Sequence, residues 1–228
     1  MEPILLKLMN ADGTYRGTFA DCIFESFAAP QAIYRALLKH LRKYGLTLTD
    51  LTSDMTRLSD AHISCFLSKL NTLIFIRLER LDMSFSNLHE IGADIVSQIL
   101  LDSCAALQEV QALGEIVEHH VGLNIVANIQ DASYDTVLRQ YVTPPSAFGE
   151  HTLTGLAFYI PENAAHGARH GSLVLDHVPG QDHQLMLRAN MIFDGTQIPV
   201  QTLAPQVNTF MTHTLHSLGL AFAKEHTP

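Results

Sequence analysis

The chain has 228 residues, of which 47% are hydrophobic and 16% are charged. That length can bury a sizeable core, and that composition is typical of an ordered globular protein rather than a disordered one. The formal net charge of −9 disfavours a nucleic-acid backbone or an anionic membrane as the main partner, because both are themselves negatively charged. The low charged fraction also indicates that a partner covers some of the surface, and a homodimer would satisfy this.

The N-terminal residues predict neither a signal peptide nor a membrane span. Glu2 is followed by only a brief apolar run, Ile4–Leu6, and no later apolar run reaches spanning length. Cysteine usage points to a reducing compartment, because the three residues are odd in number, widely spaced and without a CxxC pair. We therefore expect a cytoplasmic protein with reduced thiols in apolar surroundings, at Cys22, Cys65 and Cys104.

The first half of the chain predicts alternating strands and helices. Residues 1–20 are weakly patterned, with a turn at Asp12 and Gly13. The apolar run Leu73–Ile76 predicts a central strand of a sheet with both faces covered. In chain order, the expected elements are a strand over Asp21–Phe27, a helix over Pro30–Tyr44 that stops at Gly45, a strand with loops within Leu46–Asp60, a hairpin of His62–Leu67 with Leu73–Leu78, a strand at Leu81–Phe85, and a helix over Glu90–Val110.

The second half repeats this plan after a boundary at Gly114. Pro161–Gly171 is expected to be a loop and the most mobile segment of the chain. The other expected elements are a strand over Val121–Ile129, a short helix over Asp131–Tyr141 capped by Asp131 or Ser133, a strand over Leu153–Ile160, a hairpin of Gly171–Val178 with Leu185–Phe193, a break at Asp194 and Gly195, and a last helix that reaches Phe222, with Pro205 in its first turns.

Each half thus reads as strand, helix, about three antiparallel strands, helix. The fold class expected is α+β, with two pseudo-repeated halves of about three to four antiparallel strands packed with helices and closed by a long C-terminal helix. The halves, residues 1–112 and 115–228, are expected to pack together as one compact unit.

In the C-terminal half, Val121–Asn128 reads V-G-L-N-I-V-A-N, and Leu138–Pro145 forms a Leu-x-x-x-x-x-Pro-Pro element. Both are similar to elements of a sporadically distributed bacterial protein family of unknown function, whose members have a strand of the type I-G-L-R-Y-V-N. A hairpin and a closing helix follow, the helix with a Leu-His pair similar to Leu215 and His216, and then a final Phe like Phe222.

The resemblance covers roughly Ile116–Phe222, and Phe24–Leu107 shows a weaker similarity to the same family. Members often carry acidic residues in the last strand, where this chain has Arg188, Ala189 and Asn190. The family brings no catalytic residues, so the resemblance implies a bacterial origin and a fold, and no activity.

Histidine is the one unusual count, at 13 residues, and it is a common metal ligand and general base. His213 and His216 are three apart on the last helix, opposite its apolar stripe, and read as exposed side chains. His119 and His120 point to opposite faces of a strand, so one of them is expected in the core. The best metal candidates lie in the loop and hairpin between residues 161 and 183: His166, His170, His177 and His183, with Asp176 and Asp182 nearby.

Other chemistry has little support in the sequence. The motifs GxSxG, HExxH, GxGxxG and GxxxxGK[ST] do not occur. In Leu185–Phe193, however, one set of alternating residues is wholly apolar, whereas the other contains Met186, Arg188, Asn190 and Ile192. Such a mixed face suits a binding groove or a subunit interface, or is simply an exposed sheet face.

These patterns favour a non-enzymatic binding or interaction protein without a cofactor. Its sheet faces would hold a protein, a peptide or a small apolar ligand, with Arg188, Asn190 and Met186 as the contact residues. The alternative is a metal-dependent enzyme that uses the histidine-rich segment 161–183. A third reading is a homo-oligomer whose sheet face is its own interface.

Overall fold

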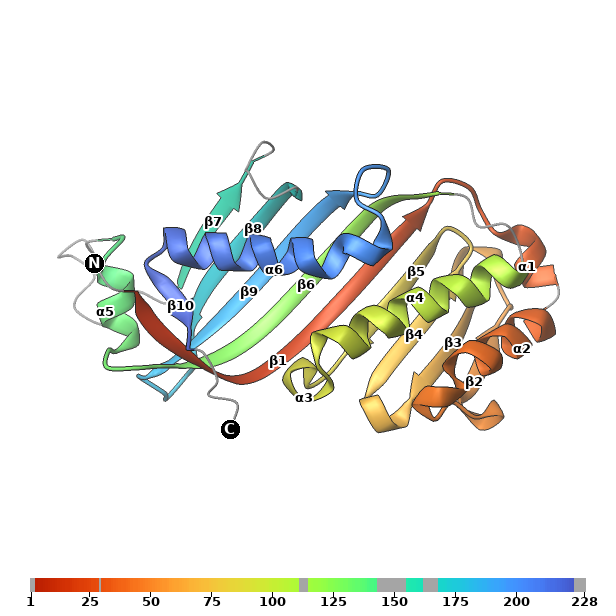
Figure 1. Ribbon diagram of the computed structural model, residues 1–228, viewed down its shortest axis with the longest axis horizontal. Coiled ribbons are helices and arrows are strands. Elements are labelled where there is room, and N and C mark those ends of the chain that lie inside the picture. Colours follow the sequence, from red (N-terminus) through yellow and green to blue (C-terminus); the bar gives the residue numbers. More distant parts are fainter. Residues whose placement is uncertain (1–2, 29, 111–114, 143–154, 162–167, 224–228) are drawn as a thin grey trace. The chain divides into compact units, whose positions relative to one another are not determined.

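The computed structural model describes residues 3–28, 30–110, 115–142, 155–161 and 168–223 (Figure 1). It confirms an α+β fold. The strands are β1 Ile4–Phe19, β2 Leu51–Asp54, β3 His62–Leu67, β4 Thr72–Arg77, β5 Arg80–Phe85, β6 Ile116–Ile129, β7 Gly155–Ile160, β8 Ala168–His177, β9 Gln184–Asp194 and β10 Leu220–Phe222. The α-helices are α1 Phe24–Ala28, α2 Pro30–Leu41, α3 Leu88–Ile91, α4 Ala93–Val110, α5 Tyr134–Arg139 and α6 Val200–Ser217.

The order of the strands supports the expected duplication. Along the sheet the strands run β2-β3-β4-β5-β1-β6-β9-β8-β7, and β10 pairs with β1. In the first half, a strand and helices precede an antiparallel run whose last strand, β5, returns beside β1. In the second half, β6 and α5 precede β7, β8 and β9, and β9 returns beside β6. Both halves therefore share one topology, each followed by a long helix.

By contacts, the chain divides into two compact units that interleave in sequence. Unit 1 comprises Met1–Ala11, Gly122–Met191 and Gln206–Pro228, and unit 2 comprises Asp12–Val121 and Ile192–Pro205. Strands β1, β6 and β9 and helix α6 contribute residues to both. The expected division between residues 112 and 115 stays a prediction, because residues 111–114 lie outside the described part of the chain.

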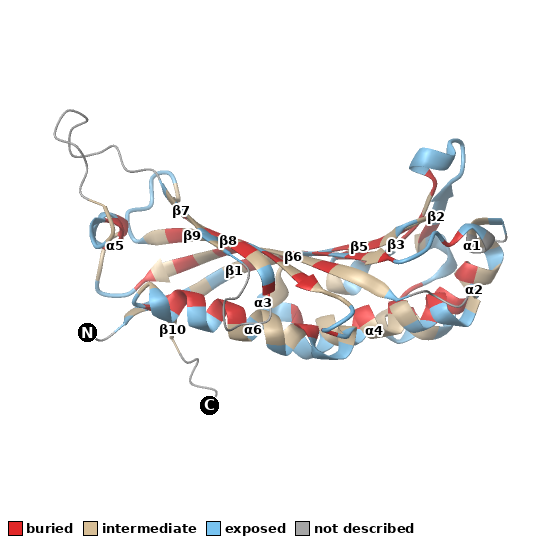
Figure 2. Cartoon of the chain, turned by 90° about the horizontal axis from the view of Figure 1, so that it is seen from above, coloured by how far each residue is buried: buried red, intermediate tan, exposed pale blue. Residues whose placement is uncertain are grey.

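In unit 2, helices α2 and α4 cover one face of the sheet (Figures 1 and 2). The strands alternate, so that buried side chains such as Ile74 and Leu81 point to the helices and their neighbours point away. Among the described residues, the opposite face has no helix over it. The antiparallel register sets its side chains in rows: Asp82 pairs with Arg16 on one side and with Phe75 on the other.

In unit 1, helix α6 covers one face of the sheet (Figure 2). Its buried Phe210 and Leu215 face the helix side of the strands, to which β8 contributes Leu173 and Leu175 and β9 contributes Leu187. Within the described residues no helix lies on the other face of these strands. Within the described residues, the helices of each unit therefore bury one sheet face and leave the other uncovered.

The largest error of the sequence analysis concerns the first strand. Residues 4–19 form one long strand, whereas a turn was expected at Asp12 and Gly13. The buried face of this strand carries large side chains at Leu6, Tyr15 and Phe19. The small residues Ala11, Gly13 and Gly17 occupy other inward positions, and they interrupt the alternation of large apolar residues that predicts a strand. The strand expected at Asp21–Phe27 is wrong too, because residues 24–28 are helical.

Two helices differ from their expected lengths. The helix predicted over Glu90–Val110 is interrupted at Gly92, between α3 and α4. The last helix ends at Ser217, with Pro205 inside it, instead of reaching Phe222. Gly219 takes a left-handed φ of 63° and turns the chain, so the apolar residues 220–222 form β10, parallel to residues 4–6 of β1.

The hairpins are confirmed, as are the helix beginning at Pro30 and the Ser133 cap, whose Oγ accepts a hydrogen bond from the Thr136 amide. The strand over Leu73–Ile76 is central, but helices cover only one of its faces. Residues 168–171 of the expected loop already belong to β8. Residues 162–167, and the Pro144-Pro145 element, lie outside the described residues.

Candidate functional site

The face predicted from β9 is present in unit 1. Leu185, Leu187 and Ala189 are buried, whereas Arg188 and Asn190 are exposed and Met186 is half-buried. The guanidinium of Arg188 donates a hydrogen bond to the carboxylate of Asp176 on β8. Asp176 is thus engaged with Arg188, and the face is a mixture of one ion pair, an amide and apolar side chains.

The histidines of the candidate metal segment do not converge where the structure describes them. The ring of His177 packs against Tyr134, at 5.2 Å between centroids, and Nδ1 of His183 is 3.1 Å from the carbonyl of Ala132. His166 lies outside the described residues. Within them, no group of three His, Cys, Asp or Glu side chains is placed to hold a metal ion. The metal hypothesis stays a prediction without a ligand set.

His119 and His120 lie on opposite faces of β6, as expected. His119 is fully buried, with Nε2 2.9 Å from the carbonyl of Ile198 and Nδ1 2.9 Å from the hydroxyl of Tyr15. A carbonyl only accepts, so Nε2 carries the proton and Nδ1 accepts from Tyr15. Burial lowers the pKa of His119, although the bond to Ile198 opposes this, and burial raises the pKa of Tyr15. His119 is therefore a neutral, fully engaged core histidine.

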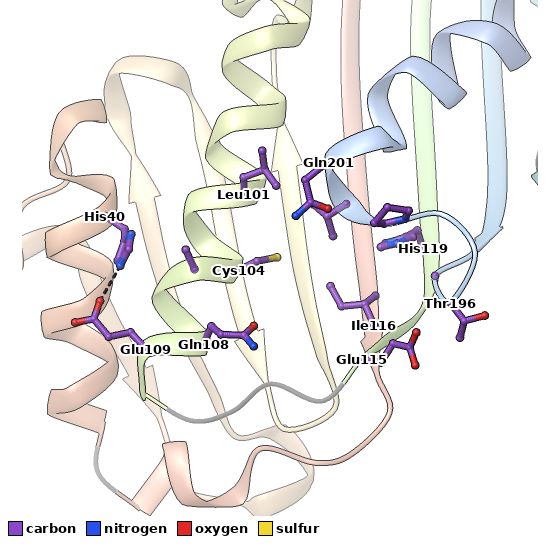
Figure 3. Close-up of a pocket in the computed structure, with 14 residues that line it drawn as sticks. His40, Leu101, Cys104, Gln108, Glu109, Glu115, Ile116, His119, Thr196 and Gln201 are labelled. Carbon is purple, nitrogen blue, oxygen red and sulfur yellow. Dashed lines mark hydrogen bonds and ion pairs between the residues drawn. The ribbon is translucent and has the colours of Figure 1, made fainter.

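A pocket of about 790 Å³ lies beside His119 in unit 2 (Figure 3). Helix α4 supplies Cys104 and Gln108, and the start of α6 supplies Gln201. The rest of the lining mixes apolar and polar side chains from α2, α4, the start of β6 and the segment after β9: His40, Leu101, Ala105, Glu109, Glu115, Ile116, His119, Gly195, Thr196, Pro199 and Val200.

The groups around this pocket are poorly suited to nucleophilic or acid–base catalysis. Burial raises the pKa of the Cys104 thiol to about 12, so the thiolate that would attack a substrate is scarce at neutral pH. The carboxylate of Glu109 is held by Lys39 and His40, each at 2.8 Å. Both ring nitrogens of His119 are already bonded. The pocket can therefore hold a small molecule, but these side chains offer no activated group.

A second charged site, on the uncovered face of unit 2, was missed by the sequence analysis. The carboxylate of Asp82 accepts hydrogen bonds from Nε of Arg16 at 2.8 Å, Arg80 at 2.9 Å and Arg77 at 3.2 Å. We call these four residues the arginine cluster. Burial alone would raise the pKa of Asp82, but the bonds from Arg16 and Arg80 outweigh it, and the pKa is lowered.

Part of this cluster had a signal in the sequence. Arg77, Arg80 and Asp82 lie on either side of a tight turn between two strands, which places them on one face. Arg16 had no such signal in the sequence, because it is 66 residues from Asp82 and contacts it only through the pairing of β1 with β5.

Aromatic side chains adjoin the arginine cluster. The guanidinium carbon of Arg77 is 5.7 Å from the ring centroid of Phe75, and the ring of His62 meets Phe75 edge-on at 5.4 Å. Phe66, in the next row, has 41% of its surface exposed. The face therefore combines cations with exposed apolar surface, which is a combination common in recognition sites.

Comparisons with known proteins assign no family. No protein-family model and no curated protein matches the chain. Among solved structures, the chain has a likeness to a Methanococcus jannaschii TBP, with a TM-score of 0.36 and 9% sequence identity over 94% of this chain and 98% of that one. In the described part of the chain, each helix is too short or too polar to cross a membrane.

Proposed function

We propose that this protein is a non-enzymatic binding protein that holds a protein or peptide partner on the uncovered faces of its sheet. The observation that carries the proposal is the one-sided covering of the strands: in each unit the described helices lie on one face, and the other face presents guanidinium, amide and apolar side chains. These faces also expose Phe66 and Tyr159, by 41% and 70%, and aromatic side chains are enriched in protein interfaces.

The chemistry of these faces supports a partner that is itself a protein. Arg188 and Asn190 offer hydrogen-bond donors beside half-buried Met186 and Val174, and arginine beside apolar surface is characteristic of protein interfaces. A small apolar ligand would need a predominantly apolar hollow, whereas the pocket in unit 2 is lined by polar as well as apolar side chains, among them Gln108, Glu109 and Gln201. The free thiols of buried Cys65 and half-buried Cys104 support the accompanying expectation of a reducing, cytoplasmic location. Cys22 is free as well, but it is exposed and does not have the apolar surroundings that were expected.

Site-specific photocross-linking in cells that produce the protein tests this proposal. A benzoylphenylalanine in place of Asn190 places the reactive group on the sheet face of unit 1, and the same group in place of Arg42 places it on an exposed helical side of unit 2. We expect a discrete cross-linked partner from position 190 and none from position 42. Adding Arg188→Ala should lower the cross-linked yield several-fold while leaving the melting temperature unchanged.

Equal cross-linking from both positions, or a yield that does not depend on Arg188, would refute the proposal. Cross-links between two copies of the chain would instead identify the face as the interface of a homodimer. The intact mass of the product separates these two outcomes.

A further inference from the structure

The arginine cluster carries an excess of positive charge on a face that is open to solvent. Three guanidinium groups share one carboxylate, that of Asp82, and Glu79 adds a second, at 3.1 Å from Nη1 of Arg80. Three cations against two anions leave one positive charge, in a chain whose net charge is −9. A local excess of this sign attracts an anionic group.

The geometry leaves the recognition edges of two guanidinium groups available. Asp82 is bound through Nε in each case, and the Nη groups of Arg16 and Arg77 make no hydrogen bond to another described residue. Their side chains are 50% and 31% exposed. A guanidinium binds a carboxylate through two parallel N–H groups, and an arginine that is already held in place loses less freedom on binding. Asp82 therefore orients the cluster without saturating it.

An apolar contact lies at a fixed distance from these guanidinium groups. Across the strands, Asp82 on β5 is opposite Phe75 on β4, and in the next row Ser84 is opposite Leu73, which is opposite Phe66. Neighbouring strands are about 4.8 Å apart, so β3 lies roughly 10 Å from β5, and the next row on the same face is about 7 Å further along the strands. The diagonal from Asp82 to Phe66 is therefore roughly 12 Å. An extended chain rises about 3.3 Å per residue, so roughly three to four residues span that distance.

We propose that the arginine cluster and Phe66 bind an acidic segment of a partner protein in an extended conformation. Carboxylates of the segment pair with Arg16 and Arg77, and an apolar side chain about three residues away covers Phe66. This inference rests on the proposed function and names the chemistry of its partner. A nucleic acid fits less well, because Asp54 lies opposite His62 at the outer edge of the same face and interrupts any track of cations.

Fluorescence anisotropy with the purified 228-residue chain tests the inference. The probe is a fluorescein-labelled seven-residue peptide with two adjacent glutamates and a phenylalanine three residues further on. We expect Arg16→Gln and Arg77→Gln each to weaken its binding about fivefold. The charge-matched control Arg35→Gln, at an exposed position on α2, should change it less than twofold. Phe66→Ser should weaken it as well, and a probe with glutamine in place of glutamate should bind at least tenfold more weakly.

Three results would overturn the inference: equal binding of the glutamine probe, unchanged binding by both cluster variants, or an equal loss with Arg35→Gln. Tighter, cluster-dependent binding of a 12-nucleotide single-stranded DNA would overturn it in favour of a nucleic-acid surface. Circular dichroism melting of each variant separates lost binding from lost folding, and Arg16→Lys, which retains the charge, provides a second test if a glutamine variant unfolds. If position 190 gives cross-links to a partner but the peptide does not bind at the arginine cluster, this inference is refuted and the proposed function is unaffected.

Discussion

The buried pair of Tyr15 and His119 makes a quantitative prediction about stability. Tyr15→Phe removes the hydroxyl that donates to Nδ1 of His119 at 2.9 Å, where the two side chains are 5% and 0% exposed. The ring cannot turn to find another donor without breaking its bond to Ile198. A buried acceptor left without a partner costs about 1–3 kcal/mol, so we expect the free energy of unfolding to fall by that amount.

Urea unfolding followed by circular dichroism measures this loss, with Tyr159→Phe as the matched control because Tyr159 is 70% exposed. For a chain of this size, each kcal/mol corresponds to about 2–4 °C in melting temperature. Gly17→Ala should break the same bond, since a Cβ there would lie 2.4 Å from the Tyr15 hydroxyl. The loss in the double variant should then be smaller than the sum of the single losses. A Tyr15→Phe protein as stable as the Tyr159→Phe control would refute this account of the pair.

Three further predictions follow from the same unit. Because the pKa of His119 is lowered, this histidine is protonated in the unfolded chain but stays neutral in the folded chain as pH falls below about 6.5. The free energy of unfolding should therefore decrease there by at most about 1.4 kcal/mol per pH unit. His119→Gln should flatten that slope in denaturation curves measured at several pH values. Asp82→Asn leaves three guanidinium groups without their shared carboxylate, so thermal melting should show a loss of about 1–3 kcal/mol, whereas a neutral effect would mean that the cluster is merely solvated. Gly195→Ala places a Cβ 2.0 Å from the backbone oxygen of Ile116, and a backbone atom cannot move aside as a flexible side chain can. Calorimetry should therefore show that the free energy of unfolding falls by at least about 1–3 kcal/mol.

The sequence was informative where the structure depends on neighbours along the chain. The hairpin of β3 with β4 follows from two apolar stretches on either side of a short turn. Helix α5 begins directly after Ser133 because the serine side chain caps it. The inward and outward faces of β9 follow from the period of two, so Arg188 and Asn190 are exposed as expected.

Features that depend on distant residues were beyond such reasoning. The arginine cluster forms because β1 pairs with β5 in a register that places Arg16 opposite Asp82, and no local pattern specifies that register. Likewise, residues 220–222 continue the helical apolar pattern and become a strand only because residues 4–6 offer an open edge. Tertiary pairing decided the structure at these positions, in competition with local propensity.

The pairing of β10 with β1 also has a consequence for the order in which the protein is made. Residues 4–6 leave the ribosome more than 200 residues before their partners, residues 220–222. Unit 2 is almost complete once residue 121 has been synthesised, whereas unit 1 needs both ends of the chain. During synthesis the apolar residues Ile4, Leu5 and Leu6 are therefore exposed while the rest of the chain emerges, and a chain cut short before Leu220 would keep that strand edge open to aggregation.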